Sequence, residues 1–207
     1  QVGYSADFMI DSAKSLLVTL NSDTDISTLL YYRDVDAIEM QKAISKLSSY
    51  STSMPFVQSI NIYNSLENSF YTTIPSLGIQ DSDSFYDEQL VQILNKGRST
   101  FSFMPLPRRL NQPNVLQGNN NLTNVFTFIF KDAAAGGKPT SAIILNVSEL
   151  WIRQVINLLN AESQGSIFIV NRQGIIVSSA HSDEMLSDIS DTSYFKKINR
   201  SKALSGY

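Results

Sequence analysis

An internal repeat is the feature that most constrains the fold of this 207-residue chain. Residues 59–64 read SINIYN and residues 166–171 read SIFIVN, so both fit the pattern S-I-x-I-x-N. Each is followed by a second strand-like run and then by a D-[ST]-x-Y sequence. The second runs cover 69–73 and 175–179, and the D-[ST]-x-Y sequences cover 83–86 and 191–194. Features that recur in the same order indicate a duplicated structural unit.

Both copies predict the same local structure. β-Branched and aromatic residues are frequent in the paired runs, as they are in strands. In the second copy NRQG separates the two runs, and its Gly174 tolerates the positive φ of a tight turn. D-[ST]-x-Y then opens a helical pattern in each copy. We therefore predict strand, strand and helix in each, with Asp83 or Ser84 capping the first of these helices.

The first copy continues well beyond its helix. We predict a strand over 100–104 that Pro105 and Pro107 end, because proline cannot donate a hydrogen bond to a sheet. The polar, Asn-rich stretch 111–124 is typical of a loop. Two further strands should complete this sheet, over 125–131 and 140–147.

The first 55 residues show helical periodicity in place of strand patterns. Apolar residues recur near helical spacing up to Leu20, and the polar residues 21–25 then offer a break and new N-caps. A second apolar run begins at Ile26. The pattern predicts one long N-terminal helix followed by one or two shorter helices.

Composition argues against several classes of function. The net charge of -3 and the lack of a basic run argue against nucleic-acid binding. Without cysteine the chain has no disulfides, no thiolate catalysis and no cysteine metal ligands. No apolar stretch reaches the roughly 18 residues typical of a membrane helix. The hydrophobic content of 43% is enough for a packed core.

Catalytic chemistry has little support in the sequence. The single histidine, His181, lies in a polar stretch after a predicted strand, where a side chain is commonly exposed. HExxH, P-loop and G-x-S-x-G patterns do not occur. Asp183 and Glu184 would need a partner in a cleft for acid–base work, and the sequence indicates none. We therefore expect no enzyme, no catalytic residue, no cofactor and no metal site.

Six stretches between Phe56 and Tyr207 carry a family resemblance. They are FVQSINIYNSLENSFYTT, DSFYDEQLVQIL, NVFTFIF, SAIILNVSELWIRQVI, SIFIVNRQGIIVSS and SYFKKINRSKALSGY. Their order resembles that of a double Cache (PAS-like) sensor domain, an extracytoplasmic part of bacterial transmembrane receptors. The likeness is greatest to sensors of Gram-positive bacteria, in which the domain precedes a histidine kinase or a membrane-tethered AraC-type DNA-binding regulator.

The resemblance implies an α+β fold with a long N-terminal helix and two PAS-like (Cache) antiparallel-sheet modules in tandem, the second incomplete. It also implies a ligand-sensing ectodomain on the extracellular face of the cell membrane, attached through flanking segments and dimerised through the N-terminal helix. The implied divisions are a helical stalk over 1–55, a membrane-distal module over 56–147, a linking helix over 148–162 and a partial membrane-proximal module over 163–207.

The same resemblance places a small-molecule ligand in the distal module, whether a sugar, an amino acid or a carboxylate. Aromatic rings there could stack on a ligand, tyrosine adds a hydroxyl, and Arg98 would recognise a carboxylate. Strand alternation puts Phe126, Phe128 and Phe130 on one face, and core packing is the alternative role for any of these aromatics. The candidate ligand contacts are Tyr63, Tyr71, Arg98, Phe101, Phe103, Phe126 and Phe128.

Amino-acid-binding members of the family carry a set of aromatic residues, an Arg and a late Asp that has no convincing match here. Arg98 precedes a predicted strand and Asp132 follows one, but the aromatic spacing between them differs. The resemblance therefore does not support an amino acid as the ligand. Two other classes stay open: a ligand-independent module that reads a partner protein, and a soluble binding or hydrolytic domain.

Overall fold

In the computed structural model the chain gathers into two compact units. One unit is residues 7–148, and the other combines residues 149–207 with residues 1–6. The structure describes residues 2–75, 77–95, 102–114, 119–133, 139–160 and 167–201.

Three helices begin the chain, as the periodicity predicts: α1 (Val2–Ser22), α2 (Thr24–Tyr31) and α3 (Ala37–Ser53). The first break falls at Asp23, whose carboxylate accepts hydrogen bonds from the backbone amides of Asp25 and Ile26. Asp36 caps α3 in the same way, through the amide of Ile38. An aspartate at this position satisfies amides that the first helical turn leaves unpaired.

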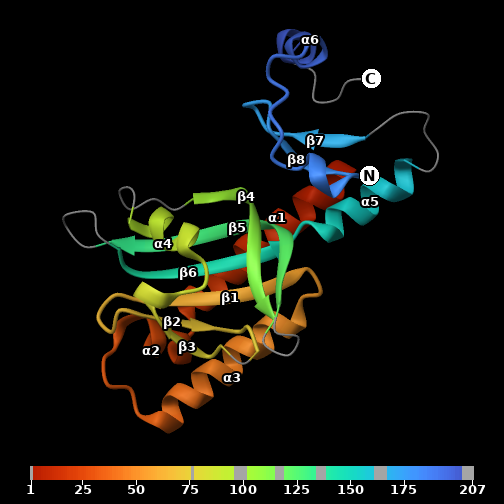
Figure 1. Ribbon diagram of the computed structural model, residues 1–207. Helices are drawn as coiled ribbons and strands as arrows, with labels where there is room; N and C mark the ends of the chain where they lie inside the picture. The colour runs from red at the N-terminus through yellow and green to blue at the C-terminus, as the bar shows by residue number, and fades with distance from the viewer. Residues whose placement is uncertain are drawn as a thin grey trace. The chain divides into compact units, whose positions relative to one another are not determined.

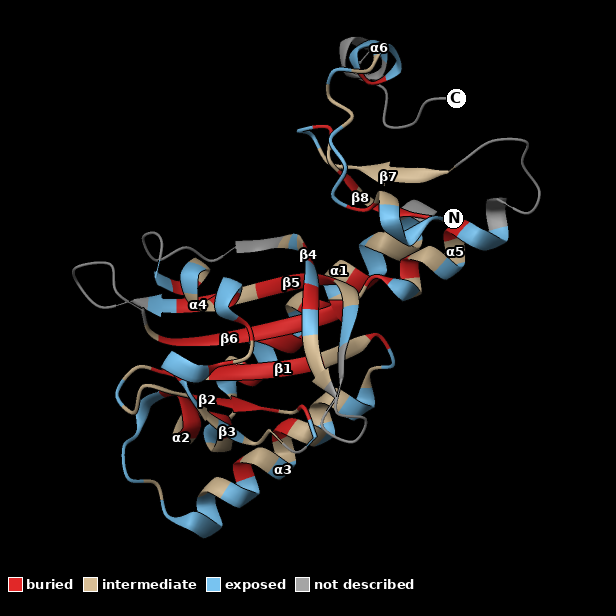
Figure 2. Cartoon of the chain, in the orientation of Figure 1, coloured by how far each residue is buried: buried red, intermediate tan, exposed pale blue. Residues whose placement is uncertain are grey.

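A six-stranded antiparallel sheet forms the centre of the 7–148 unit, in the order β3-β2-β1-β6-β5-β4 (Figure 1). Its two middle strands, β1 and β6, are among the most buried parts of the unit (Figure 2). Strands β1, β2, β5 and β6 lie where the sequence predicts strands. The strands are β1 (Val57–Asn64), β2 (Ser69–Thr72), β3 (Ile79–Asp81), β4 (Ser102–Asn114), β5 (Asn119–Ala133) and β6 (Pro139–Ser148).

One face of this sheet packs against the N-terminal helices. Asn64 at the end of β1 donates hydrogen bonds from its side-chain amide to the carbonyl oxygens of Leu29 and Tyr32, at 3.1 and 2.8 Å. Because side chains alternate along a strand, Ile60 and Ile62 point to the same side as Asn64, and both are fully buried. We call this side the helix-facing side of the sheet.

The outer strand β4 departs from the prediction. It runs through Pro105 and Pro107, so the expected strand end at 104 is wrong. β4 and β5 also pair from Asn114↔Asn119 onward, so the loop expected over 111–124 is wrong for the described residues. β4 lies at the sheet edge, where amides on the outer side have no ladder partner, and this position accommodates proline.

The helix that follows β3 begins later than the sequence predicts. Helix α4 (Glu88–Asn95) is preceded by Asp87, whose carboxylate accepts a hydrogen bond from the amide of Leu90 at 3.0 Å. Asp83 and Ser84 form part of a separate 3₁₀ turn, η1 (Ser82–Ser84), so neither caps α4. The segment DSFYD offers two capping carboxylates, and tertiary packing selects the second.

The unit that contains residues 149–207 has the strand, strand and helix that the internal repeat predicts. A 3₁₀ turn precedes the helix in both copies, and the first copy has an additional strand, β3, before that turn. Gly174 has φ +86°, as the turn requires. The division into the four predicted segments, and the incomplete second module, stay predictions. The elements here are α5 (Leu150–Asn160), β7 (Phe168–Val170), β8 (Ile176–Ser179), η2 (Ser182–Glu184) and α6 (Ser193–Ser201).

Candidate functional site

The second face of the large sheet carries α4, and we call it the α4 face. Its members follow from the strand register, because directly paired residues point to the same side of a sheet. Asn146 of β6 pairs with Ser59 of β1 and with Thr127 of β5. The α4 face includes Ser59, Asn61, Tyr63, Phe70, Gln80, Arg108, Thr127, Ile129, Lys131, Ala142, Ile144 and Asn146.

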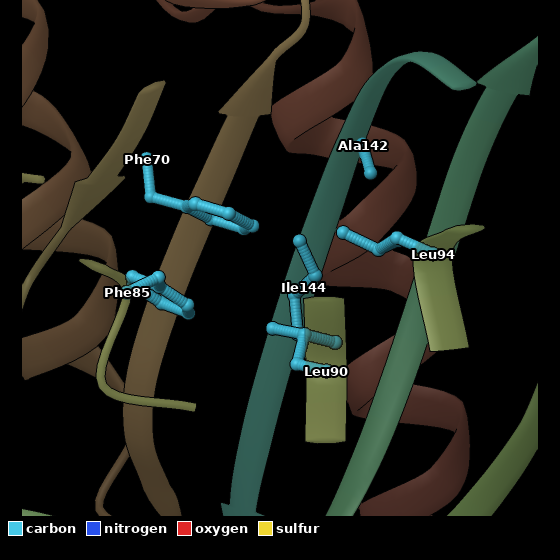
Figure 3. Packing of buried hydrophobic residues seen from close by; sticks show 6 residues of the cluster. All are labelled: Phe70, Phe85, Leu90, Leu94, Ala142 and Ile144. Carbon is cyan, nitrogen blue, oxygen red and sulfur yellow. The ribbon is translucent and has the colours of Figure 1, made fainter. Parts of the chain in front are cut away.

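Half of the α4 face is an apolar cluster. Leu90 and Leu94 of α4 point toward β6, and the rings of Phe70 and Phe85 stack with centroids 3.8 Å apart at an interplanar angle of 9° (Figure 3). Burying each such side chain contributes about 1.5–3 kcal/mol, so this cluster holds α4 on the sheet. The cluster comprises Phe70, Phe85, Leu90, Leu94, Ala142 and Ile144, with Tyr63, Tyr86, Val91 and Ile129 packed against it.

The other half of the α4 face is a buried polar network across four strands. Arg108 of β4 donates from both terminal nitrogens to the Asp87 carboxylate, at 2.9 and 2.8 Å, and from Nε to the Thr127 hydroxyl at 3.0 Å. Thr127 donates in turn to the Asn146 carbonyl oxygen at 2.7 Å. The Asn146 amide then donates to the Ser59 hydroxyl at 3.0 Å, where the chain of bonds reaches β1.

Charged and polar groups anchor α4 at both of its ends. At its start, Asp87 receives the Leu90 amide while it is paired with Arg108. At its end, the buried ammonium of Lys131 donates to the carbonyl oxygen of Leu94 at 2.6 Å. Burial lowers the pKa of Lys131, because the interior disfavours its charged form. These bonds tie the position of α4 to strands β4 and β5.

Three polar side chains on this face have buried atoms without a hydrogen-bond partner: both amide atoms of Asn61, the hydroxyl of Tyr86 and the carbonyl oxygen of Gln80. Burial raises the pKa of the Tyr86 hydroxyl, and the charge of Asp87 raises it further. The nearby side chains of Asn61 and Ser59 offset part of that rise. Asn61 therefore lies close to the Tyr86 hydroxyl, although no hydrogen bond with suitable geometry joins them.

An unpartnered buried amide is costly, by about 1–3 kcal/mol, and native proteins contain few such groups. Asn61 is fully buried in the central strand β1, where an apolar residue would be more stable. Such a group needs an explanation, and a ligand that supplies the missing partners is one. Asn61 and Tyr86 thus lie at the centre of the candidate site.

The predicted ligand contacts fall in three different places. Tyr63 lies on the α4 face and packs against the apolar cluster. Tyr71, Phe126 and Phe128 are buried on the helix-facing side, since Phe128 pairs with Leu145 and Leu145 pairs with Ile60. Their position favours packing, and their role in binding stays a prediction. Arg98 and Phe101 lie outside the described residues, as does the side chain of Phe103.

Sequence reasoning missed the polar residues of the α4 face. Asn61, Arg108 and Asn146 lie within strands, where an aromatic residue draws attention first. Their signal is a polar side chain inside an apolar run, as in IILNV for Asn146. A buried polar residue needs a partner, so such positions indicate a network or a site.

Two further searches cover only the residues that the structure describes. Among them, no group of three or more His, Asp or Glu side chains is placed to hold a metal ion. None of these helices combines the length and apolar character needed to cross a membrane. His181 is exposed beside the turn η2.

Solved structures with a similar fold include sensory domains of bacterial chemoreceptors. The periplasmic sensory domain of the Campylobacter jejuni chemoreceptor Tlp1 matches with a TM-score of 0.62 at 10% identity, over 97% of this chain and 77% of that one. The extracellular domain of vpHK1S-Z8, a protein named as a histidine kinase, matches with a TM-score of 0.59 at 14% identity, over 100% of this chain and 78% of that one. The sensory domain of C. jejuni Tlp3 with isoleucine bound matches with a TM-score of 0.55 at 13% identity, over 96% of this chain and 74% of that one.

At these identities the likeness is one of fold. An N-terminal helix and an antiparallel sheet of the sensory PAS/Cache-like kind are shared, which confirms the predicted fold class. Of these neighbours, the Tlp1 domain is named as periplasmic and the vpHK1S-Z8 domain as extracellular, and the Tlp3 domain has isoleucine bound. Comparisons with protein-family models and with curated proteins find no match.

Proposed function

We propose that this chain is the ligand-sensing part of a bacterial receptor and that it binds a small molecule on the α4 face. The observation that carries the proposal is the fully buried Asn61, whose amide atoms make no hydrogen bond of good geometry and lie close to the Tyr86 hydroxyl, which makes none either. The surrounding side chains of Arg108, Thr127 and Asn146 are hydrogen-bonded within the protein, which holds this part of the face in place. A site that combines a rigid frame with a few unpartnered polar atoms is typical of small-molecule binding.

Helix α4 is the element through which binding would become a signal. Tyr86, at the site, immediately precedes Asp87, and Asp87 both caps α4 and pairs with Arg108. A ligand that binds more tightly to one position of this segment shifts the population toward it, by an amount set by the difference in affinity. Ligand binding at Tyr86 would thus favour one position of α4 on the sheet.

The finer features of the receptor are part of the same proposal. They are a double Cache organisation with the boundaries given above, location outside the cytoplasm, dimerisation through the N-terminal helix, and an origin in Gram-positive bacteria. The output would be a histidine kinase or an AraC-type DNA-binding regulator. Support for them comes from the sequence resemblance, and the fold shared with vpHK1S-Z8 agrees with a kinase output.

Thermal melting against a panel of sugars, amino acids and carboxylates tests the proposal. A ligand at 100 times its dissociation constant adds about 2.7 kcal/mol to the free energy of unfolding. For a chain of this size the melting temperature then rises by roughly 5–10 °C.

A variant pair places the site. Tyr63→Ala on the α4 face should weaken binding, while Leu122→Ala, at an exposed position on the β4–β5 hairpin, should not. If no compound of any class shifts the melting temperature, the proposal fails, and the module that reads a partner protein becomes the better hypothesis.

A further inference from the structure

The unpartnered groups of the α4 face and its charged groups differ in a way that bears on the ligand. This step rests on the proposed function, since it concerns the ligand of that same site. The unpartnered groups are the side-chain amide of Asn61, the side-chain carbonyl oxygen of Gln80 and the phenol hydroxyl of Tyr86. All three are uncharged, and together they offer both donors and acceptors.

The charged groups of this face are already engaged. Arg108 is 5% exposed and its guanidinium makes a two-point contact with Asp87, which is the usual geometry for binding a carboxylate. Lys131 donates to the Leu94 carbonyl. A carboxylate ligand would have to displace Asp87 from Arg108, which would leave Asp87 buried without its partner at a cost of several kcal/mol.

A negative charge near the site also disfavours an anion. Burial raises the pKa of the Tyr63 hydroxyl, and the charge of nearby Asp83 raises it further. The same charge would repel a carboxylate placed beside Tyr63. A zwitterionic amino acid needs a cation partner and an anion partner together, and among the described residues of this face the cations are taken.

Hydroxyl groups suit what remains. A hydroxyl donates and accepts at once, as does the amide of Asn61, so adjacent hydroxyls can satisfy both amide atoms. Tyr86 lies close enough to Asn61 to add its hydroxyl to this group, and a phenol hydroxyl likewise donates and accepts. We infer that the ligand of the α4 face is an uncharged polyhydroxyl compound of the sugar class, held by Asn61 and Tyr86.

Matched pairs of probes test this directly. Isothermal titration calorimetry would compare neutral sugars and polyols with their acids, such as D-galactose with D-galacturonate and D-glucose with D-glucuronate, and with L-isoleucine as the amino acid. We expect at least one neutral member to bind, and to bind at least tenfold more tightly than its acid. Equal or tighter binding of an acid or of isoleucine overturns the inference and leaves the sensor function standing. Failure of every neutral probe also overturns it, and failure of all classes removes the sensor function as well.

Variants locate the binding groups. Asn61→Leu removes the unpartnered amide, so it should abolish sugar binding and raise the melting temperature of the ligand-free protein. Asn61→Ala gives the same binding result if leucine proves too large. Ser141→Ala is the matched control, because Ser141 also has a buried unpartnered oxygen but lies on the helix-facing side beside Asn64. Unchanged sugar affinity in both Asn61 variants, or equal loss in Ser141→Ala, refutes the assignment.

Discussion

The buried ion pair of Arg108 and Asp87 gives the most demanding test of the structure. The two side chains are only 5% and 4% exposed. In Arg108→Leu the Asp87 carboxylate keeps the Leu90 amide but loses both guanidinium bonds, and Thr127 loses the Nε donor. Removing one partner of a buried pair costs about 3–5 kcal/mol, because the remaining charge is left without compensation.

That loss is large enough to measure by melting. At about 2–4 °C per kcal/mol for a chain of this size, Arg108→Leu should lower the melting temperature by roughly 6–20 °C. Differential scanning calorimetry and urea unfolding would both report it. Arg109→Leu is the control, because the neighbouring arginine is exposed and a surface contact contributes at most about 1 kcal/mol.

A double variant separates charge from packing. Asp87→Asn combined with Arg108→Leu removes both charges, and asparagine still caps a helix well. The double variant should therefore be more stable than Arg108→Leu alone. The reasoning is refuted if Arg108→Leu costs less than about 1 kcal/mol, or if the added Asp87→Asn change makes the protein less stable still.

Three further predictions concern other parts of the chain. Burial alone would raise the pKa of Asp23, but its hydrogen bonds, first of all from Lys46, lower it below the ordinary 3.8. The stabilisation from Asp23 is thus complete above about pH 4 and is lost as the pH falls through the lowered pKa, so melts of the wild type and Asp23→Asn should converge toward about pH 2. Gly174→Ala should destabilise the unit that contains residues 149–207, because φ is +86° and a Cβ would lie 2.7 Å from the Cα of Ser190. Hydrogen exchange in β7 and β8 should then be faster, and unchanged exchange would count against the turn. Phe128→Ala should cost about 3–5 kcal/mol in urea unfolding and leave ligand affinity intact, and weaker binding by the folded variant would place Phe128 at the site instead.

Local patterns in the sequence account for most of the correctly predicted elements. The helical periodicity of residues 1–55 and the polar break near Asp23 depend only on nearby residues, and both predict the observed helices. Strand β4 could not be recognised this way. Its prolines are tolerated because it lies at the sheet edge, and edge position depends on how distant strands pair.

The same limit applies to the candidate contacts on β5. Alternation correctly places Phe126, Phe128 and Phe130 on one side of the strand, as the register with β6 confirms. Nothing in the alternation says which side faces the helices. That choice is visible only through contacts such as the bonds of Asn64 to α2, which join residues more than thirty positions apart.

Polar residues within the strands carry more information about the site than the aromatic residues do. An aromatic ring in a strand is stable in the core whatever the protein does, whereas a buried amide or guanidinium is stable only with partners. Asn146 and Arg108 find theirs within the protein, so their burial is explained by the network alone. Asn61 is as deeply buried as Asn146 and finds none. In the sequence Asn61 and Asn146 look alike, as asparagines within strands. Only the number of hydrogen-bond partners distinguishes them, so Asn61 is the position at which a bound ligand has the most to supply.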